Sequence, residues 1–190
     1  MSSFAILSVF NKTNIDTIAR FLVEKGHQIL STGGTYRYLE SKNIPVIQVS
    51  DFTKYPEILN GRVKTLHPDI YGGILGYRAN GEELKGYINV VVVNLYPFKE
   101  VISKEHTLND AIENIDIGGV SLLRAGAKNY QHVVSLTNPD DYQGFIDNYD
   151  NIFKDENMRL DYAKKSLHHV TNYDIEISQY FNPKKVYRQY

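Results

Sequence analysis

The sequence predicts an open α/β fold with a mainly parallel sheet, flanking helices and a C-terminal helical extension. Three observations lead to this fold class. Short apolar runs alternate with helical patterns, as in proteins whose parallel strands are joined by helices. The run from Ile88 to Val93 is β-branched and apolar on both faces, which is typical of a central strand. The pair Gly33 and Gly34 ends another such run and indicates a strand-to-helix turn.

The remaining elements follow from the spacing of apolar residues. We expect further strands at residues 4–9, 28–31, 46–49 and 133–136. We expect helices from residue 15 to a stop at Lys25–Gly26, and at 35–42, 108–114, 119–129 and 140–148. Thr107 is the predicted N-cap of the helix at 108–114, because a threonine hydroxyl can accept a bond from a free N–H of the first turn.

A chain of 190 residues can bury a full core, and we expect one domain. Residues 1–150 are predicted to form the α/β core, and residues 151–190 a helical extension of the same domain. In the extension, apolar residues recur at helical spacing up to Phe181, in a pattern that admits a break near Asn172. This helix is predicted to pack on the domain or on a partner subunit. The tail from 182 to 185 is predicted to be a linker or a free end.

Composition argues against several classes of function. The 21 basic residues nearly balance the 22 acidic ones, so we expect no nucleic acid held by bulk charge. With no cysteine, a disulfide framework, a zinc–thiolate site and a cysteine nucleophile are excluded, and a reducing compartment is permitted. The six histidines show no metal-ligand spacing, so we predict no metal. No stretch approaches the ~20 apolar residues of a membrane span, and the N-terminus is predicted to be a strand, not a signal peptide.

Polar residues follow three of the predicted strands. Asn11 and Lys12 follow the first strand, residues 32–35 the second, and Asn94 and Tyr96 the valine-rich strand. Open α/β sheets bind ligands beyond the carboxyl ends of their strands. We therefore expect these side chains to meet at one edge of the sheet.

Two segments suit a phosphate. The segment from Gly61 to Pro68 places Arg62, Lys64 and Thr65 beside a turn, and cations with a hydroxyl favour an anionic oxygen ligand. The turn Thr32-Gly33-Gly34-Thr35 brings backbone N–H groups and a helix N-terminus to the same kind of ligand. Lys12 would add a third cation. The alternatives are a basic surface loop, an ordinary strand-to-helix turn and a solvated lysine.

Two further segments have residues that could bind a nucleobase and the reacting group of a substrate. Asn94 can read an amide edge with a donor and an acceptor, and Tyr96 offers a phenol. Asp116 precedes a glycine pair that is predicted to open a helix, whose free N–H groups can bind a developing oxyanion. Lys128 lies toward the far end of that helix. The alternatives are a packed aromatic turn, a capping carboxylate at Asp116 and a cation at a helix C-terminus.

Taken together, the motifs resemble the IMP cyclohydrolase domain, the N-terminal half of a bifunctional family that also carries AICAR formyltransferase. The matching segments keep the family's order over essentially the whole chain: Lys12-Thr13, Gly33 to Thr35, Pro56-Glu57, Gly61 to Pro68, Gly73 to Leu75, Asn94 to Phe98, Ile115 to Gly119, Leu122 to Asn129, Tyr173-Asp174 and Tyr180-Phe181. Each segment is moderately specific, and the set is highly specific.

The resemblance implies a methylglyoxal-synthase-like fold and dehydrative ring closure of formyl-AICAR (FAICAR) to inosine monophosphate (IMP), in the cytoplasm, by a homodimer that needs no cofactor and no metal. The implied partner is a small-molecule nucleotide, not a nucleic acid or a membrane. The implied catalytic residues are Lys64, Tyr96, Asp116 and Lys128. The implied substrate-binding residues are Lys12, Thr32, Gly33, Gly34, Thr35, Arg62, Thr65, Asn94, Ile117 and Gly118.

Some positions depart from the family pattern. Phe10-Asn11 stands where the family commonly has serine-aspartate, Asn14 where it has glycine, Thr32 where it has serine, and Tyr71 where it has histidine. The chain ends near where the formyltransferase half would begin, so we expect no formyltransferase activity from it. Three rival interpretations stay open: a non-catalytic domain that binds a phosphorylated effector, methylglyoxal synthase itself, and an inactive homologue that associates through its C-terminal helices.

Overall fold

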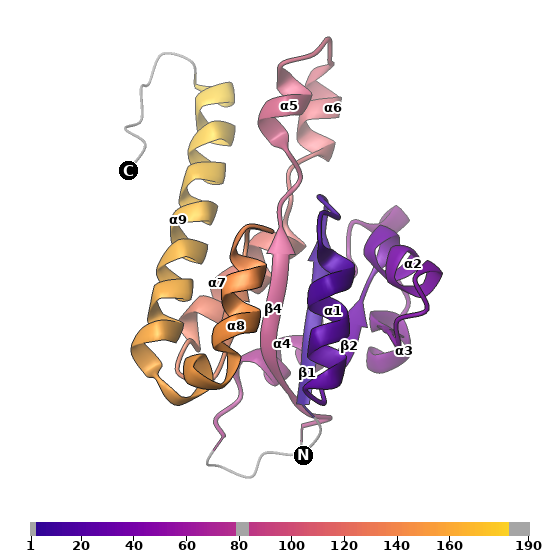
Figure 1. The fold of residues 1–190 in the computed structure, drawn as a ribbon. Coiled ribbons are helices and arrows are strands. Elements are labelled where there is room, and N and C mark those ends of the chain that lie inside the picture. Colours follow the sequence, from indigo (N-terminus) through magenta and orange to yellow (C-terminus); the bar gives the residue numbers. More distant parts are fainter. Residues whose placement is uncertain (1–2, 79–83, 183–190) are drawn as a thin grey trace.

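The computed structural model describes residues 3–78 and 84–182, which build one sheet of five strands covered by helices (Figure 1). The strands are all parallel, in the order β3-β2-β1-β4-β5. Their bounds are β1 Ser3–Val9, β2 Gln28–Ser31, β3 Ile47–Gln48, β4 Tyr87–Asn94 and β5 Val134–Leu136. All five predicted strands are confirmed. The third is shorter than predicted, because Val49 already begins a helix.

The helices include every one that the sequence predicts. The predicted ones are α1 Ile15–Glu24, α2 Gly33–Ser41, α6 Leu108–Glu113, α7 Gly118–Lys128, α8 Asp141–Lys154 and α9 Glu156–Phe181. Short helices that were not predicted are α3 Val49–Thr53, α4 Pro68–Leu75, α5 Phe98–Ile102 and the 3-10 turn Leu59–Gly61. Thr107 caps α6 in a capping box with Asp110, as predicted. The break that the pattern allowed near Asn172 does not occur, since α9 is continuous. The predicted linker begins at Asn182, and from residue 183 it lies outside the described residues.

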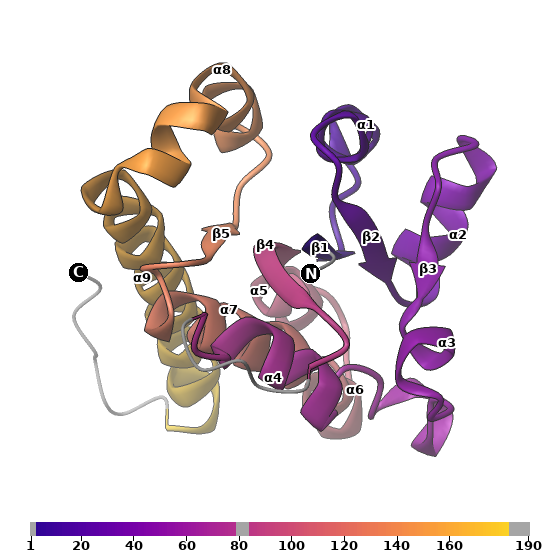
Figure 2. The ribbon, with the colours of Figure 1, turned by 90° about the horizontal axis from the view of Figure 1, so that it is seen from below.

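Two apolar layers enclose the sheet. Alternate residues of β1 point to opposite faces, with Phe4 and Ile6 in one core and Ala5 and Leu7 in the other. Helices α1, α2 and α8 cover the second face, and α4, α7 and α9 cover the first, as Figure 2 shows from below. The inner strands β1 and β4 are therefore buried on both sides, which explains their long apolar runs.

This architecture exposes functional groups at one end of the sheet. Helices α2 and α7 both begin at the carboxyl end, directly after Thr32 and Ile117. Helix α9 packs along α7 and buries Val170 and Tyr173 in the first core. None of the helices in the described part of the chain is long and apolar enough to cross a membrane.

Candidate active site

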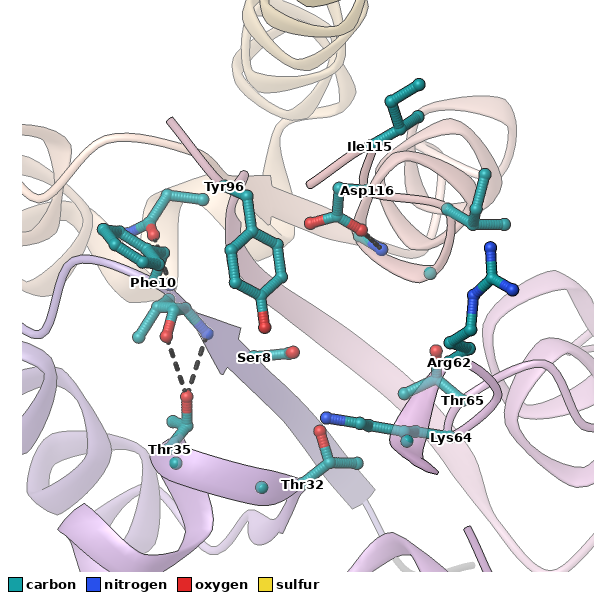
Figure 3. A pocket seen from close by; sticks show the side chains of 18 of the residues that line it. Ser8, Phe10, Thr32, Thr35, Arg62, Lys64, Thr65, Tyr96, Ile115 and Asp116 are labelled. Atoms are coloured by element: carbon teal, nitrogen blue, oxygen red, sulfur yellow. Dashed lines mark hydrogen bonds between the residues drawn. The ribbon is translucent and has the colours of Figure 1, made fainter. Parts of the chain in front are cut away.

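A cavity of about 520 Å³ opens beyond the carboxyl ends of β1, β2 and β4 (Figure 3). The strand order reverses between β1 and β4, and open α/β sheets bind ligands at such a point. All but one of the predicted site residues line this cavity: Lys12, Thr32, Gly33, Gly34, Thr35, Arg62, Lys64, Thr65, Asn94, Tyr96, Asp116, Ile117 and Gly118. Residues distant in sequence therefore meet at one edge of the sheet, as expected.

Lys128 is the exception. It is the last residue of α7, whose first residue, Gly118, lines the cavity. Ten helical steps span about 15 Å, and the Lys128 side chain is exposed at the far end. Within a single copy of the chain Lys128 therefore lies outside this cavity, and its catalytic role stays a prediction. As a lysine in the last turn, it interacts favourably with the helix dipole.

Small residues make room for Lys64 beside the first turn of α2. Gly33 opens that helix at φ 49°, and a Cβ built there would lie 3.3 Å from the Lys64 Nζ. Gly61 has φ 82°, and a Cβ there would lie 2.6 Å from the Lys64 Cε. The left-handed backbone favours glycine at both positions, and a Cβ at either one would press on the end of the Lys64 side chain. The ammonium therefore lies close to the free N–H groups of a helix N-terminus, which is an arrangement that suits an anion.

Two of the predicted phosphate ligands already have protein partners. The Thr35 hydroxyl donates to the Val9 carbonyl at 3.0 Å and accepts from the Val9 N–H at 3.1 Å. Its single proton is thus used to tie α2 to the end of β1, so Thr35 can offer a ligand its backbone N–H but not its hydroxyl. The Lys12 Nζ donates to the carbonyls of Val9 and Phe10. Burial lowers the pKa of Lys12.

Arg62 lies at the mouth of the cavity. Its Nε is 3.5 Å from the Glu113 Oε2, with both side chains largely exposed. Glu113 comes from the end of α6 and lines the cavity too. An exposed ion pair of this kind contributes little to stability, so the guanidinium can exchange this carboxylate for a ligand anion at low cost.

Asp116 is the partly buried acid of the site. Its Oδ1 accepts the Gly119 N–H at 2.7 Å, and its own N–H donates to the Tyr173 hydroxyl at 2.7 Å. Burial raises the pKa of the Asp116 carboxyl, while the backbone N–H groups of Gly119 and Tyr96 and the charge of Lys64 lower it. A Cβ at Gly119 would lie 2.7 Å from the Asp116 Oδ2, so only glycine leaves room for this carboxylate.

Asn94 has a different role from the predicted one. Its Oδ1 accepts the N–H groups of Phe10 and Asn11 at 2.7 and 2.9 Å, and its Nδ2 donates to the Asn11 carbonyl at 3.0 Å. The amide oxygen is therefore occupied by the turn after β1. This corrects the prediction that Asn94 reads the carboxamide with both a donor and an acceptor, since one N–H remains for a ligand.

The departures from the family pattern have local explanations. The Asn11 Oδ1 accepts the backbone N–H and the hydroxyl of Thr13, which are bonds that an aspartate at this position could also accept. Asn14 has φ 56°, and asparagine tolerates that left-handed conformation better than most residues with a side chain. Phe10 is 51% exposed, and its ring lies 5.4 Å from that of Tyr96.

Sequence reasoning assigned no role to Tyr173, Glu113 or Phe10. Tyr173 belongs to a segment that matches the family, which was the available signal for it. Glu113 gave none, because its place at the cavity depends on how α6 packs. Among the described residues, no group of three or more histidine, aspartate and glutamate side chains could hold a metal ion.

Two family models match this chain. The model of the MGS-like domain matches residues 14–121. The chain belongs to the MGS-like domain family. A second model, described as the AICARFT/IMPCHase bienzyme, matches residues 126–190. The predicted methylglyoxal-synthase-like fold class is thereby confirmed, with a five-stranded parallel sheet and flanking helices.

This member of the MGS-like family is similar to longer bacterial proteins. It is 46% identical over 189 residues to the bifunctional purine biosynthesis protein PurH of Staphylococcus saprophyticus. The aligned region covers 95% of this chain and 38% of that protein. It is 47% identical over 194 residues to PurH of Leptospira biflexa, with 95% and 37% covered. The chain thus spans about 38% of the length of the curated relatives that it matches. The crystal structure of ForH has a TM-score of 0.80 and 30% identity, and covers 96% of this chain and 100% of that one.

Proposed function

We propose that this chain is an IMP cyclohydrolase, which closes the ring of FAICAR to form IMP and water. The observation that carries the proposal is the single cavity in which an anion-binding edge, formed by α2, Arg62 and Lys64, faces the partly buried acid Asp116 and the phenol of Tyr96. The similarity to PurH proteins and to the AICARFT/IMPCHase model supports the same reaction. A domain that only binds an effector would not need the acid and the phenol.

The ribose phosphate would bind at the anion-binding edge. The free N–H groups at the start of α2 and the cations of Arg62 and Lys64 would hold its oxygens. Thr32, with its hydroxyl toward the cavity in Figure 3, adds a donor. This placement directs the imidazole with its formamide and carboxamide toward Tyr96 and Asp116, which lie across the cavity from Thr32 and Lys64 in Figure 3.

Ring closure needs one nitrogen–carbon bond and the loss of water. The carboxamide nitrogen attacks the formyl carbon, and the formyl oxygen takes up negative charge. The carbon–oxygen bond then breaks as the formamide nitrogen loses its proton and forms a double bond to that carbon. The departing oxygen leaves as water, with one proton from each nitrogen. Binding both groups in contact removes several kcal/mol of the barrier, since the reaction is intramolecular.

Asp116 is the proposed base. A carboxylate whose pKa is raised by burial accepts a proton from an amide more readily than an exposed one. The Tyr96 hydroxyl, the Lys64 ammonium and the Gly118 N–H at the start of α7 are the proposed donors to the formyl oxygen. Loss of one such donor costs about 3 kcal/mol. Lys128 has no part in this scheme.

The proposal extends to the compartment and the oligomeric state of the enzyme. By the same resemblance we infer a cytoplasmic homodimer that binds a nucleotide. The exposed apolar side chains Leu167 and Phe181 on α9 support a partner-facing surface, because each is more than two-fifths exposed. Sedimentation at several protein concentrations would test the dimer, and a monomer at all of them would contradict it.

The direct test mixes the purified chain with FAICAR and follows IMP by absorbance. We expect IMP to form at an enzymatic rate without added metal or cofactor, and Asp116→Asn to lower that rate at least about 100-fold. The control is Asp161→Asn, which changes an exposed carboxylate on α9. A rate equal to the uncatalysed reaction would refute the proposal.

A further inference from the structure

Phe10 connects three residues of the site. Its N–H donates to the Asn94 Oδ1 at 2.7 Å, and its carbonyl accepts the Lys12 Nζ at 3.0 Å. Its ring packs on the Tyr96 ring with centroids 5.4 Å apart and planes tilted by 56°. Hydrogen bonds to the N–H and to the carbonyl thus hold the main chain of Phe10, and they fix the position from which its side chain extends.

Tyr96 has Phe10 as its aromatic neighbour. It follows β4 in the loop before α5, and its side chain is 45% exposed. Within the described part of the chain, Phe10 is the one aromatic ring in contact with it. Figure 3 shows the Tyr96 hydroxyl directed into the cavity toward Ser8, with the Phe10 ring beside it. A half-exposed phenol without this contact would have other rotamers open to it.

We propose that Phe10 is a positioning residue that holds the Tyr96 hydroxyl toward the reacting atoms. The inference rests on the proposed cyclohydrolase function, in which Tyr96 donates to the formyl oxygen. Tilted aromatic pairs attract one another beyond the area that they bury. Asn94 then acts on Tyr96 through Phe10, because its amide oxygen accepts the N–H of the residue whose ring packs on Tyr96. This gives a function to the amide oxygen of Asn94, which is occupied by the turn after β1.

The alternative role of Phe10 is direct contact with the substrate base, since it also lines the cavity. The two roles differ in how Phe10 and Tyr96 combine. A positioning residue has no effect once the hydroxyl that it positions is gone. A substrate contact keeps its effect whether or not that hydroxyl is present.

The test is a double-mutant cycle on the full chain with FAICAR as substrate. It compares the wild type, Phe10→Ala, Tyr96→Phe and the double variant. We expect Phe10→Ala to lower kcat about tenfold and to change KM less than about twofold, given the strength of such ring pairs. In the Tyr96→Phe background, the same change should alter kcat less than about twofold. Phe10→Tyr, which keeps a ring, should restore most of kcat.

A matched control is Tyr77→Ala. Tyr77 is an aromatic residue that is 69% exposed and does not line the cavity. It should leave kcat unchanged. Circular dichroism checks folding, and Phe10→Leu replaces Phe10→Ala if the latter does not fold.

Equal losses of kcat in the two backgrounds, a loss confined to KM, full activity of Phe10→Ala, or full activity of Tyr96→Phe would each overturn the positioning role. These outcomes require a wild type that forms IMP, so they leave the proposed function intact. A wild type that forms no IMP would overturn both proposals.

Discussion

The two ends of the sheet use polar side chains in opposite ways. At the amino end, a chain of hydrogen bonds runs from the Arg78 guanidinium to Asn89, Ser3, His27 and the Tyr149 hydroxyl, with lengths of 3.0, 3.0, 2.9 and 2.6 Å. Each member of the chain has a polar partner. At the carboxyl end, the polar groups face a cavity, and several keep donors or charges that the protein does not satisfy.

The difference separates stability from function. The amino end places polar groups where they bond one another, which stabilises the fold. The carboxyl end keeps a partly buried acid with a raised pKa, a lysine with a lowered one, and left-handed backbone at Leu59, Asn60 and Gly61 beside Arg62. Such features cost stability, and functional sites are where they collect. Changes at the two ends should therefore have opposite effects on activity and stability.

The largest effect is expected from Asp116→Asn. Removing the base should lower kcat by about 100- to 10,000-fold. Burial raises the pKa of Asp116, so the folded state favours its protonated form and carries the ionised form at a cost near pH 7. Asparagine keeps an acceptor for the Gly119 N–H without that charge. The free energy of unfolding, measured with urea at pH 7, should thus be unchanged or higher. A kcat within tenfold of wild type would contradict the role of Asp116.

The amino end should give the reverse result with Asn89→Ala. Asn89 joins Arg78 to Ser3, and its loss leaves both without this partner. We expect the free energy of unfolding to fall by about 1–3 kcal/mol while kcat stays the same. Asn148→Ala is the matched control, because its amide bonds the Gly144 carbonyl on an exposed surface. A drop in kcat for Asn89→Ala, with stability intact, would break the comparison.

Arg62→Ala should act on affinity. Without the guanidinium at the mouth, the dissociation constant of IMP, measured by calorimetry, should rise about tenfold, since one charge-assisted contact is lost. The change should be smaller at high salt. Glu113→Gln should lower the dissociation constant of IMP, because it frees Arg62 from its 3.5 Å ion pair. A loss of kcat with affinity intact would contradict phosphate binding by Arg62.

The smallest effect concerns His27. Burial lowers its pKa, so the unfolded chain takes up the proton first as the pH falls. The free energy of unfolding should therefore decrease below about pH 6.5, by at most about 1.4 kcal/mol per pH unit from this group. Urea unfolding at pH 7.5 and 5.5 should show a smaller difference for His27→Gln than for wild type. Equal differences would mean that His27 is not linked to folding.

Sequence patterns predicted the sheet and the edge where the site residues meet, because apolar runs and strand order determine both. They could not show how neighbouring turns satisfy each other. The occupied amide of Asn94 and the occupied hydroxyl of Thr35 depend on bonds to the end of β1 that only the folded chain reveals. The short helices α3 and α5 are too short for a periodic signal.

The position of Lys128 could have been checked from the sequence. Its distance from Gly118 follows from helix geometry alone, at about 1.5 Å per residue. The family resemblance placed it among the catalytic residues, and the length of α7 puts it outside the cavity of its own copy of the chain. A residue transferred by motif therefore needs a check against the rise of its own helix.

The most direct test of the account is a crystal structure of the chain with IMP. We expect one IMP in the cavity, with its phosphate between the first turn of α2 and Arg62, and its base against Tyr96 and Asp116. A phosphate bound elsewhere on the molecule, or a base directed away from Asp116, would contradict the assignment of this cavity as the cyclohydrolase site.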